Sequence, residues 1–121
     1  MRRTAIAPRL MIVIAFSTMS CPSFAGEYAP LNCNKASSAT EKTICGSYAL
    51  GQSEARLATL YSVATSLVAM GQRSDIQDAQ RQWISTRNAC GEDIGCLTAA
   101  YDQRIRALSG VIAAIASHGP Y

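Results

Sequence analysis

Four cysteines, in two pairs that are close in sequence, constrain the fold of this chain more than any other feature. Cys33 and Cys45 form the first pair, and Cys90 and Cys96 form the second. An even number of cysteines in a small exported domain predicts two disulfides. Sequence alone leaves three pairings open, and we expect the local one, because each pair is close in the chain. A zinc site is the alternative, but its typical C-x2-C spacing is missing.

The N-terminus has the order of a secretory signal peptide. Three arginines accompany an apolar run over residues 10–16, and Ser23-Phe24-Ala25 supplies small residues at the −3 and −1 positions of a cleavage site. The apolar run is too short for a membrane span, which needs about 20 residues. We therefore expect residues 1–25 to be removed and residues 26–121 to form one periplasmic or secreted domain.

A fifth cysteine, Cys21, lies inside this leader and raises the question of a lipid anchor. Ser20 before it suits a lipoprotein signal, but Thr18 stands where an aliphatic residue is usual. We expect soluble export, and lipidation of Cys21 stays the open alternative.

Loss of the leader changes the charge balance. The whole chain has 11 basic and 8 acidic residues and a formal net charge of +3. Three arginines and no acidic residue lie in residues 1–25, so the remainder is neutral. Binding to nucleic acid or to an anionic membrane surface needs a surplus of lysine and arginine. We therefore expect neither as the main partner.

Apolar residues recur at helical spacing after residue 37. Ser38-Ala39-Thr40-Glu41 is a capping-box pattern that predicts a short helix to Cys45, ended by a left-handed Gly46. A longer helix is expected over residues 47–70, broken at Gly71. Its apolar stripe comprises Leu50, Leu57, Leu60, Tyr61, Ala64, Leu67 and Val68.

Two further helices are expected toward the C-terminus. Ser74-Asp75-Ile76-Gln77 is a second capping-box pattern, and its helix should run to about Asn88. The last helix should cover about residues 94–117. Its stripe comprises Leu97, Tyr101, Ile105 (or Arg104), Leu108, Ile112 and Ile115. No segment has the period of a strand, so we predict an all-α fold, a small antiparallel helical bundle with two disulfides.

The sequence offers little for catalysis. The single histidine lies in His118-Gly119-Pro120, near the C-terminus, and oxidised cysteines provide no thiolate nucleophile. The acidic pairs, such as Glu92 and Asp93, lie at helix starts, where they are ordinary partners of the helix dipole. We therefore expect no enzyme activity, no metal and no cofactor.

One ordered set of residues resembles a known family. Gln80-x-x-Trp83-x-x-x-Arg87-x-x-Cys90 is followed by Cys96 and Tyr101-x-x-Arg104, and Cys33, Glu41-x-x-Ile44-Cys45 and Tyr61 precede it. Over about residues 32–109 the chain resembles the LprI-like lysozyme-inhibitor family of small exported bacterial helical proteins. Glu54 keeps the acid of the family's Leu-Asp pair. The resemblance implies a cell-envelope protein that binds a lysozyme, a peptidoglycan-cleaving glycosidase, and blocks it.

Four residues are candidates for contact with such a partner. Glu92 and Asp93 lie in the Cys90–Cys96 loop, which a disulfide would hold rigid, and an acidic loop would attract a cationic lysozyme. Trp83 and Arg87 are neighbours on one helix face, where the guanidinium can stack on the indole as an anchor. The alternative is that the acids cap the last helix and that Trp83 and Arg87 pack the helices together.

A second function class stays open, a non-enzymatic structural or stress-related periplasmic protein with another ligand. The neutral charge after leader removal favours this class, since an inhibitor of a basic enzyme is more often acidic. The structure can distinguish the two function classes, because a charge-attracting inhibitor should gather its acidic side chains on one exposed face.

Overall fold

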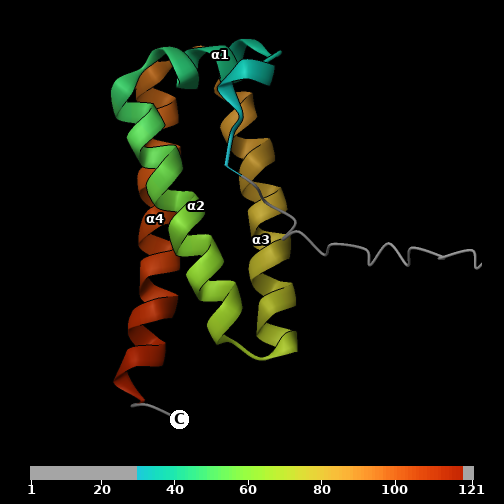
Figure 1. Cartoon of the computed structure of the whole chain (residues 1–121), viewed down its shortest axis with the longest axis vertical. Coiled ribbons are helices and arrows are strands. Elements are labelled where there is room, and N and C mark those ends of the chain that lie inside the picture. The colour runs from blue at the N-terminus through green and yellow to red at the C-terminus, as the bar shows by residue number, and fades with distance from the viewer. Residues whose placement is uncertain (1–29, 119–121) are drawn as a thin grey trace, which may run out of the picture.

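The computed structural model describes residues 30–118, which form four α-helices after one short 3-10 helix (Figure 1). The elements are η1 (Cys33–Lys35), α1 (Ala39–Gly46), α2 (Tyr48–Leu67), α3 (Met70–Ala89) and α4 (Ile94–Ser117). The predicted all-α bundle is confirmed, and the described part of the chain contains no strand. The predicted leader, with Cys21, lies outside the described residues.

The three long helices stand side by side, and α1 lies across one end of them (Figure 1). The α3 helix runs antiparallel to α2 and to α4, so α2 and α4 run in the same direction and pack most extensively on each other. Short connections explain the arrangement, because two residues between α2 and α3 and four between α3 and α4 force the chain to reverse. Both the start of α2 and the α3–α4 loop therefore lie at the α1 end.

Both predicted disulfides are present. Cys33–Cys45 ties η1 to α1, and Cys90–Cys96 closes the loop between α3 and α4. The Cα atoms are 5.6 Å apart in each pair, a normal separation for a disulfide. Both bonds thus secure the α1 end of the bundle.

The core follows the predicted stripes. Leu57 on α2 and Leu97 and Tyr101 on α4 are completely buried, and Trp83 of α3 joins the same cluster. Truncating a buried leucine of this kind to alanine typically costs about 2–5 kcal/mol of stability. Four side chains predicted for the stripes lie differently, since Leu60, Ile112 and Ile115 are only half-buried and Leu67 is exposed.

The junction between α2 and α3 differs from the prediction. The α2 helix ends at Leu67, three residues early, and α3 begins at Met70, well before the predicted start at Ser74. Gly71 lies inside α3 and does not break a helix. The glycine and capping-box signals were therefore misleading here.

A buried valine and a capping arginine set this junction. Val68 adopts an extended conformation, with φ −107° and ψ 158°, and its side chain is buried. Arg73 donates from Nε to the carbonyl of Thr65 (2.7 Å) and from Nη2 to that of Val68 (3.4 Å). These bonds satisfy carbonyls that the end of α2 leaves without helical donors.

The start of α1 agrees with the prediction, and its end does not. Ser38 and Glu41 form the predicted capping box at the start of α1. Gly46 is the last residue of α1, but among the described residues only Gly91 has a positive φ, so Gly46 is not left-handed. Ser47 instead turns the chain in an extended conformation, and its Oγ accepts from the amide of Leu50, which caps α2.

Candidate partner-binding site

The Cys90–Cys96 loop is a tight turn held by backbone bonds as well as by its disulfide. The amides of Cys90 and Gly91 donate to carbonyls in the last turn of α3, and the amide of Asp93 donates to the carbonyl of Cys90. Gly91 has a φ of 59°, which costs glycine little and other residues much more. A loop with this many constraints loses little conformational entropy when a partner binds it.

Glu92 and Asp93 are both exposed on this loop, but their environments differ. Asp93 is the N-cap of α4, and its Oδ1 accepts from the amide of Cys96 at 2.9 Å. Glu92 makes no hydrogen bond or ion pair with any described residue. The capping alternative therefore holds for Asp93, and Glu92 is a free carboxylate at the tip.

An apolar side chain lies beside these acids. Ile94, the first residue of α4, is 56% exposed. The sequence prediction treated it only as the approximate start of the last helix and said nothing about its exposure. The loop thus presents Glu92 and Ile94 together, a carboxylate next to an apolar contact.

Trp83 and Arg87 lie inside the bundle, with exposed fractions of 6% and 5%. The indole Nε1 donates to the carbonyl of Ala100 on α4 at 2.9 Å. The indole ring meets Tyr101 edge-on at 5.1 Å, and Arg87 Cζ lies 5.4 Å from the indole centroid. The predicted stacking of Arg87 on Trp83 is present. Both side chains are buried, so they pack the helices together, as the alternative interpretation expected. Of the four predicted contact residues, only Glu92 and Asp93 lie at the surface.

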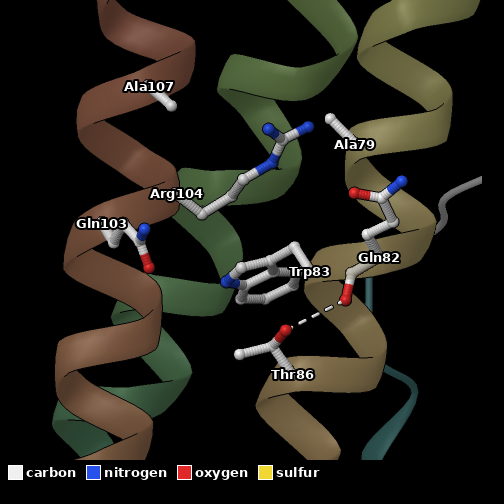
Figure 2. A pocket seen from close by; sticks show the side chains of 7 residues that line it. All are labelled: Ala79, Gln82, Trp83, Thr86, Gln103, Arg104 and Ala107. Atoms are coloured by element: carbon white, nitrogen blue, oxygen red, sulfur yellow. Dashed lines mark hydrogen bonds between the residues drawn. The ribbon is translucent and has the colours of Figure 1, made fainter.

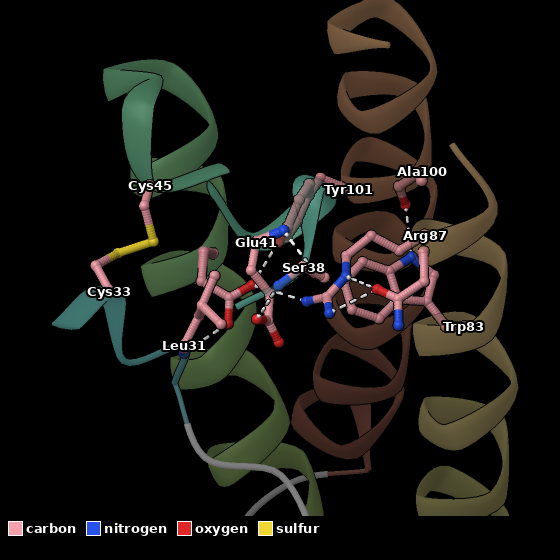
Figure 3. A network of polar contacts seen from close by, with 11 residues as sticks. Leu31, Cys33, Ser38, Glu41, Cys45, Trp83, Arg87, Ala100 and Tyr101 are labelled. Atoms are coloured by element: carbon pink, nitrogen blue, oxygen red, sulfur yellow. Dashed lines mark hydrogen bonds and ion pairs between the residues drawn. A yellow bond between two sulfur atoms is a disulfide. The ribbon is translucent and has the colours of Figure 1, made fainter. Parts of the chain in front are cut away.

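Arg87 belongs to a buried polar network centred on Glu54 (Figure 3). Glu54 Oε2 accepts from the Tyr101 hydroxyl at 2.5 Å and lies 3.7 Å from Arg87 Nη1, and Oε1 accepts from the amide of Leu31 at 3.0 Å. Burial, and then the bond to Glu54, raise the pKa of Tyr101 well above its ordinary range. The network joins α2, α3, α4 and the segment before η1.

The same network reaches the base of the loop through Asn88. Arg87 donates to Asn88 Oδ1 from Nε (3.2 Å) and Nη2 (3.0 Å), and Thr40 of α1 donates to the Asn88 carbonyl at 3.4 Å. Arg87 therefore contacts the residue three positions before the loop glycine while its own side chain is almost fully buried. One signal in the sequence could have identified Glu54 as a buried acid. It lies between Leu50 and Leu57 at helical spacing, on the face that these leucines bury.

Exposed acidic side chains are scattered over the described residues. Asp75 and Asp78 lie in the N-terminal half of α3, and Asp102 lies along α4. Asp78 is paired with Arg81. Because no broad acidic face covers residues 30–118, this test does not favour the lysozyme inhibitor over the second class, an envelope protein with another ligand.

A family model described as Lysozyme inhibitor LprI matches residues 33–115. No curated protein and no solved structure matches the chain. Across residues 30–118, no helix is long and apolar enough to cross a membrane. The same residues contain no group of three or more His, Cys, Asp or Glu side chains placed to hold a metal ion.

Proposed function

Because the chain belongs to the lysozyme inhibitor LprI family, we propose that it is exported and inhibits a lysozyme through its Cys90–Cys96 loop. Family membership carries the proposal. The inhibitor acts by occupying the enzyme and carries out no reaction of its own. Export into the periplasm or beyond accounts for the two disulfides, which persist in oxidising compartments.

The geometry of the loop supports it as the contact surface. Glu92 is free to pair with a basic residue of the enzyme, and the exposed Ile94 adds apolar area beside it. The disulfide and the Asp93 cap hold the loop in one conformation before binding. Such preorganisation improves affinity by lowering the ordering cost. Trp83 and Arg87 support the loop from within the bundle.

An inhibition assay tests the function directly. The full chain is expressed with its own leader in bacteria that form disulfides in the periplasm, and the processed product is titrated against lysozymes acting on bacterial cell walls. We expect dose-dependent inhibition with a defined stoichiometry. A folded, disulfide-intact product that inhibits none of the lysozymes would contradict the proposal and favour an envelope protein with another ligand.

A charge variant then tests the loop. Glu92→Gln should weaken inhibition mainly through slower association, and the loss should shrink as salt rises, because salt screens exposed charges. Asp102→Asn is the matched control, since it removes one exposed acid from the side of α4. Equal inhibition by the two variants would exclude Glu92 from the contact.

A further inference from the structure

A hollow of about 230 Å³ lies between α3 and α4 (Figure 2). It exists because Ala79 and Ala107 face the seam with small side chains. Its full lining is Ala79, Gln82, Trp83, Thr86, Gln103, Arg104 and Ala107. A second hollow of about 270 Å³ continues along the same seam and shares Ala79, Arg104 and Ala107 with the first.

The wall shared by the two hollows contains a buried cation that has no anionic partner among residues 30–118. Arg104 is 9% exposed, and its guanidinium extends from α4 toward Ala79 of α3 (Figure 2). It donates from Nε to Gln80 Oε1 at 2.8 Å and from Nη2 to the carbonyl of Ile76 at 3.0 Å. Both acceptors are neutral, and Nη1 donates to no described residue.

The two buried arginines, Arg87 and Arg104, have different kinds of partner. Arg87 faces the carboxylate of Glu54, whereas Arg104 forms no ion pair with any described residue. Gln80, which holds Arg104, is 1% exposed, and its Nε2 is a buried donor without an acceptor. A buried charge without a partner is costly, and so is a buried donor without an acceptor. Gln80 lines neither hollow, so the group that a ligand in a hollow can pair with is Arg104, whose two acceptors are both neutral.

The first hollow suits an anion better than the second. Asp75 lines the second hollow, and its carboxylate would repel an anionic ligand there. Within the described part of the chain, no acidic side chain lines the first hollow. Gln82 and Gln103 line it with exposed amide side chains that make no hydrogen bond to a described residue, and Trp83 adds an apolar wall. This is a mostly apolar pocket with a few convergent polar groups, as small-molecule sites usually are.

We propose that the hollow beside Trp83 binds a small carboxylate-bearing ligand, with Arg104 as its ion partner and the amides of Gln82 and Gln103 at its rim. A carboxylate matches the planar donors of a guanidinium and supplies the acceptor that Arg104 lacks. The volume admits the carboxylate and a few further heavy atoms. The site lies on the seam between α3 and α4, outside the Cys90–Cys96 loop, and does not depend on lysozyme inhibition.

Trp83 provides the readout, because it lines the hollow and is the only tryptophan in the chain. The processed full-length product is titrated with N-acetylglycine, and the indole N–H signal of Trp83 is followed by NMR. We expect a saturable shift. N-acetylglycinamide, which has the same shape without the charge, should give none.

Two variants separate ligand binding from folding. Arg104→Gln should weaken N-acetylglycine binding by about tenfold or more, the loss expected for a hydrogen-bonded charge. Ala107→Leu keeps Arg104 and fills the hollow, so it should abolish the shift in a protein of unchanged melting temperature. Ala113→Leu, at an exposed position of α4 outside the hollow, is the matched control and should bind normally. A shift that does not saturate, or that survives in Ala107→Leu, would overturn the proposal.

A second arm identifies where the carboxylate comes from. If Ala107→Leu inhibits lysozyme as well as the unchanged protein does, the hollow takes a free small ligand. If the variant loses inhibition and N-acetylglycine competes with lysozyme, the carboxylate belongs to an acidic side chain of the enzyme. Either result supports the site, provided that the titration has shown saturable binding.

Discussion

The hydroxyl of Tyr101 on α4 donates to Glu54 Oε2 on α2 across 2.5 Å, joining residues that are 47 positions apart in sequence. Both side chains are buried, so water cannot replace the bond. The bond lies at the α1 end of the parallel pair of helices, where Arg87 and the amide of Leu31 also meet Glu54. One carboxylate thus ties the N-terminal segment to the three long helices.

Tyr101→Phe removes the donor and keeps the ring. We expect a loss of about 1.5–3 kcal/mol in the free energy of unfolding, since hydrogen bonds to charged groups are worth about that much. Denaturant unfolding measures the loss. Tyr48→Phe is the matched control, because Tyr48 is 84% exposed, and it should change stability by less than about 0.5 kcal/mol. Similar losses in the two variants would mean that the buried bond contributes nothing specific.

The coupling between Glu54 and Arg87 is a separate prediction. Arg87→Met leaves a buried carboxylate with one partner fewer, and removing one member of a buried ion pair typically costs about 3–5 kcal/mol. In the double variant with Glu54→Gln, no charge is left unpaired. The double variant should therefore lose less stability than the sum of the two single variants. Additive losses in a double-mutant cycle would show that the two side chains do not interact.

Much of this fold could be predicted from local patterns. The heptad spacing of Leu50, Leu57 and Ala64 identified the buried face of α2, and all three are buried. The short separations of the cysteines gave the observed pairing. The break between α2 and α3 could not be predicted, because it depends on Arg73 reaching back to carbonyls of the preceding helix. That contact exists only once both helices have packed.

The candidate site was predicted less well. Position in the loop identified Glu92 and Asp93 as surface residues, and both are exposed. Trp83 and Arg87 have the same helical spacing whether they face solvent or the core, so the pattern left both readings open. Arg104 drew attention only as part of the family pattern and as an alternative to Ile105 in the stripe of the last helix. Its lack of an anionic partner within residues 30–118 follows from the positions of all the acidic side chains there, which no local pattern gives.

The capping box of α1 predicts a pH dependence of stability. Bonds to Glu41 Oε2 from the amides of Ser37 (2.8 Å) and Ser38 (3.1 Å) lower the pKa of this carboxyl below its ordinary value of 4.5. A group with a lowered pKa stabilises the fold above its unfolded pKa and loses that effect as pH falls through the folded pKa. The melting temperature of Glu41→Gln should therefore lie below that of the unchanged protein at neutral pH and approach it in acid.

Lys42→Gln is the control for this pH series, since it removes a neighbouring charge on α1 that does not titrate in acid. Its difference from the unchanged protein should stay constant between neutral pH and pH values below the Glu41 transition. If the Glu41→Gln difference is equally constant, the carboxylate of Glu41 is not the group that caps α1.

The two disulfides should separate stability from inhibition. Each closes a short loop, and the chain-entropy model assigns about 2–3 kcal/mol to bonds of this loop length. Replacing either pair by serine should therefore lower the free energy of unfolding by a similar amount. Only loss of Cys90–Cys96 frees the loop that carries Glu92 and Ile94, so only this variant should inhibit lysozyme more weakly at temperatures where both variants are folded. Equal inhibition by the two variants would place the contact away from the loop, and weaker inhibition by the Cys33–Cys45 variant alone would move it to α1 and the segment before it.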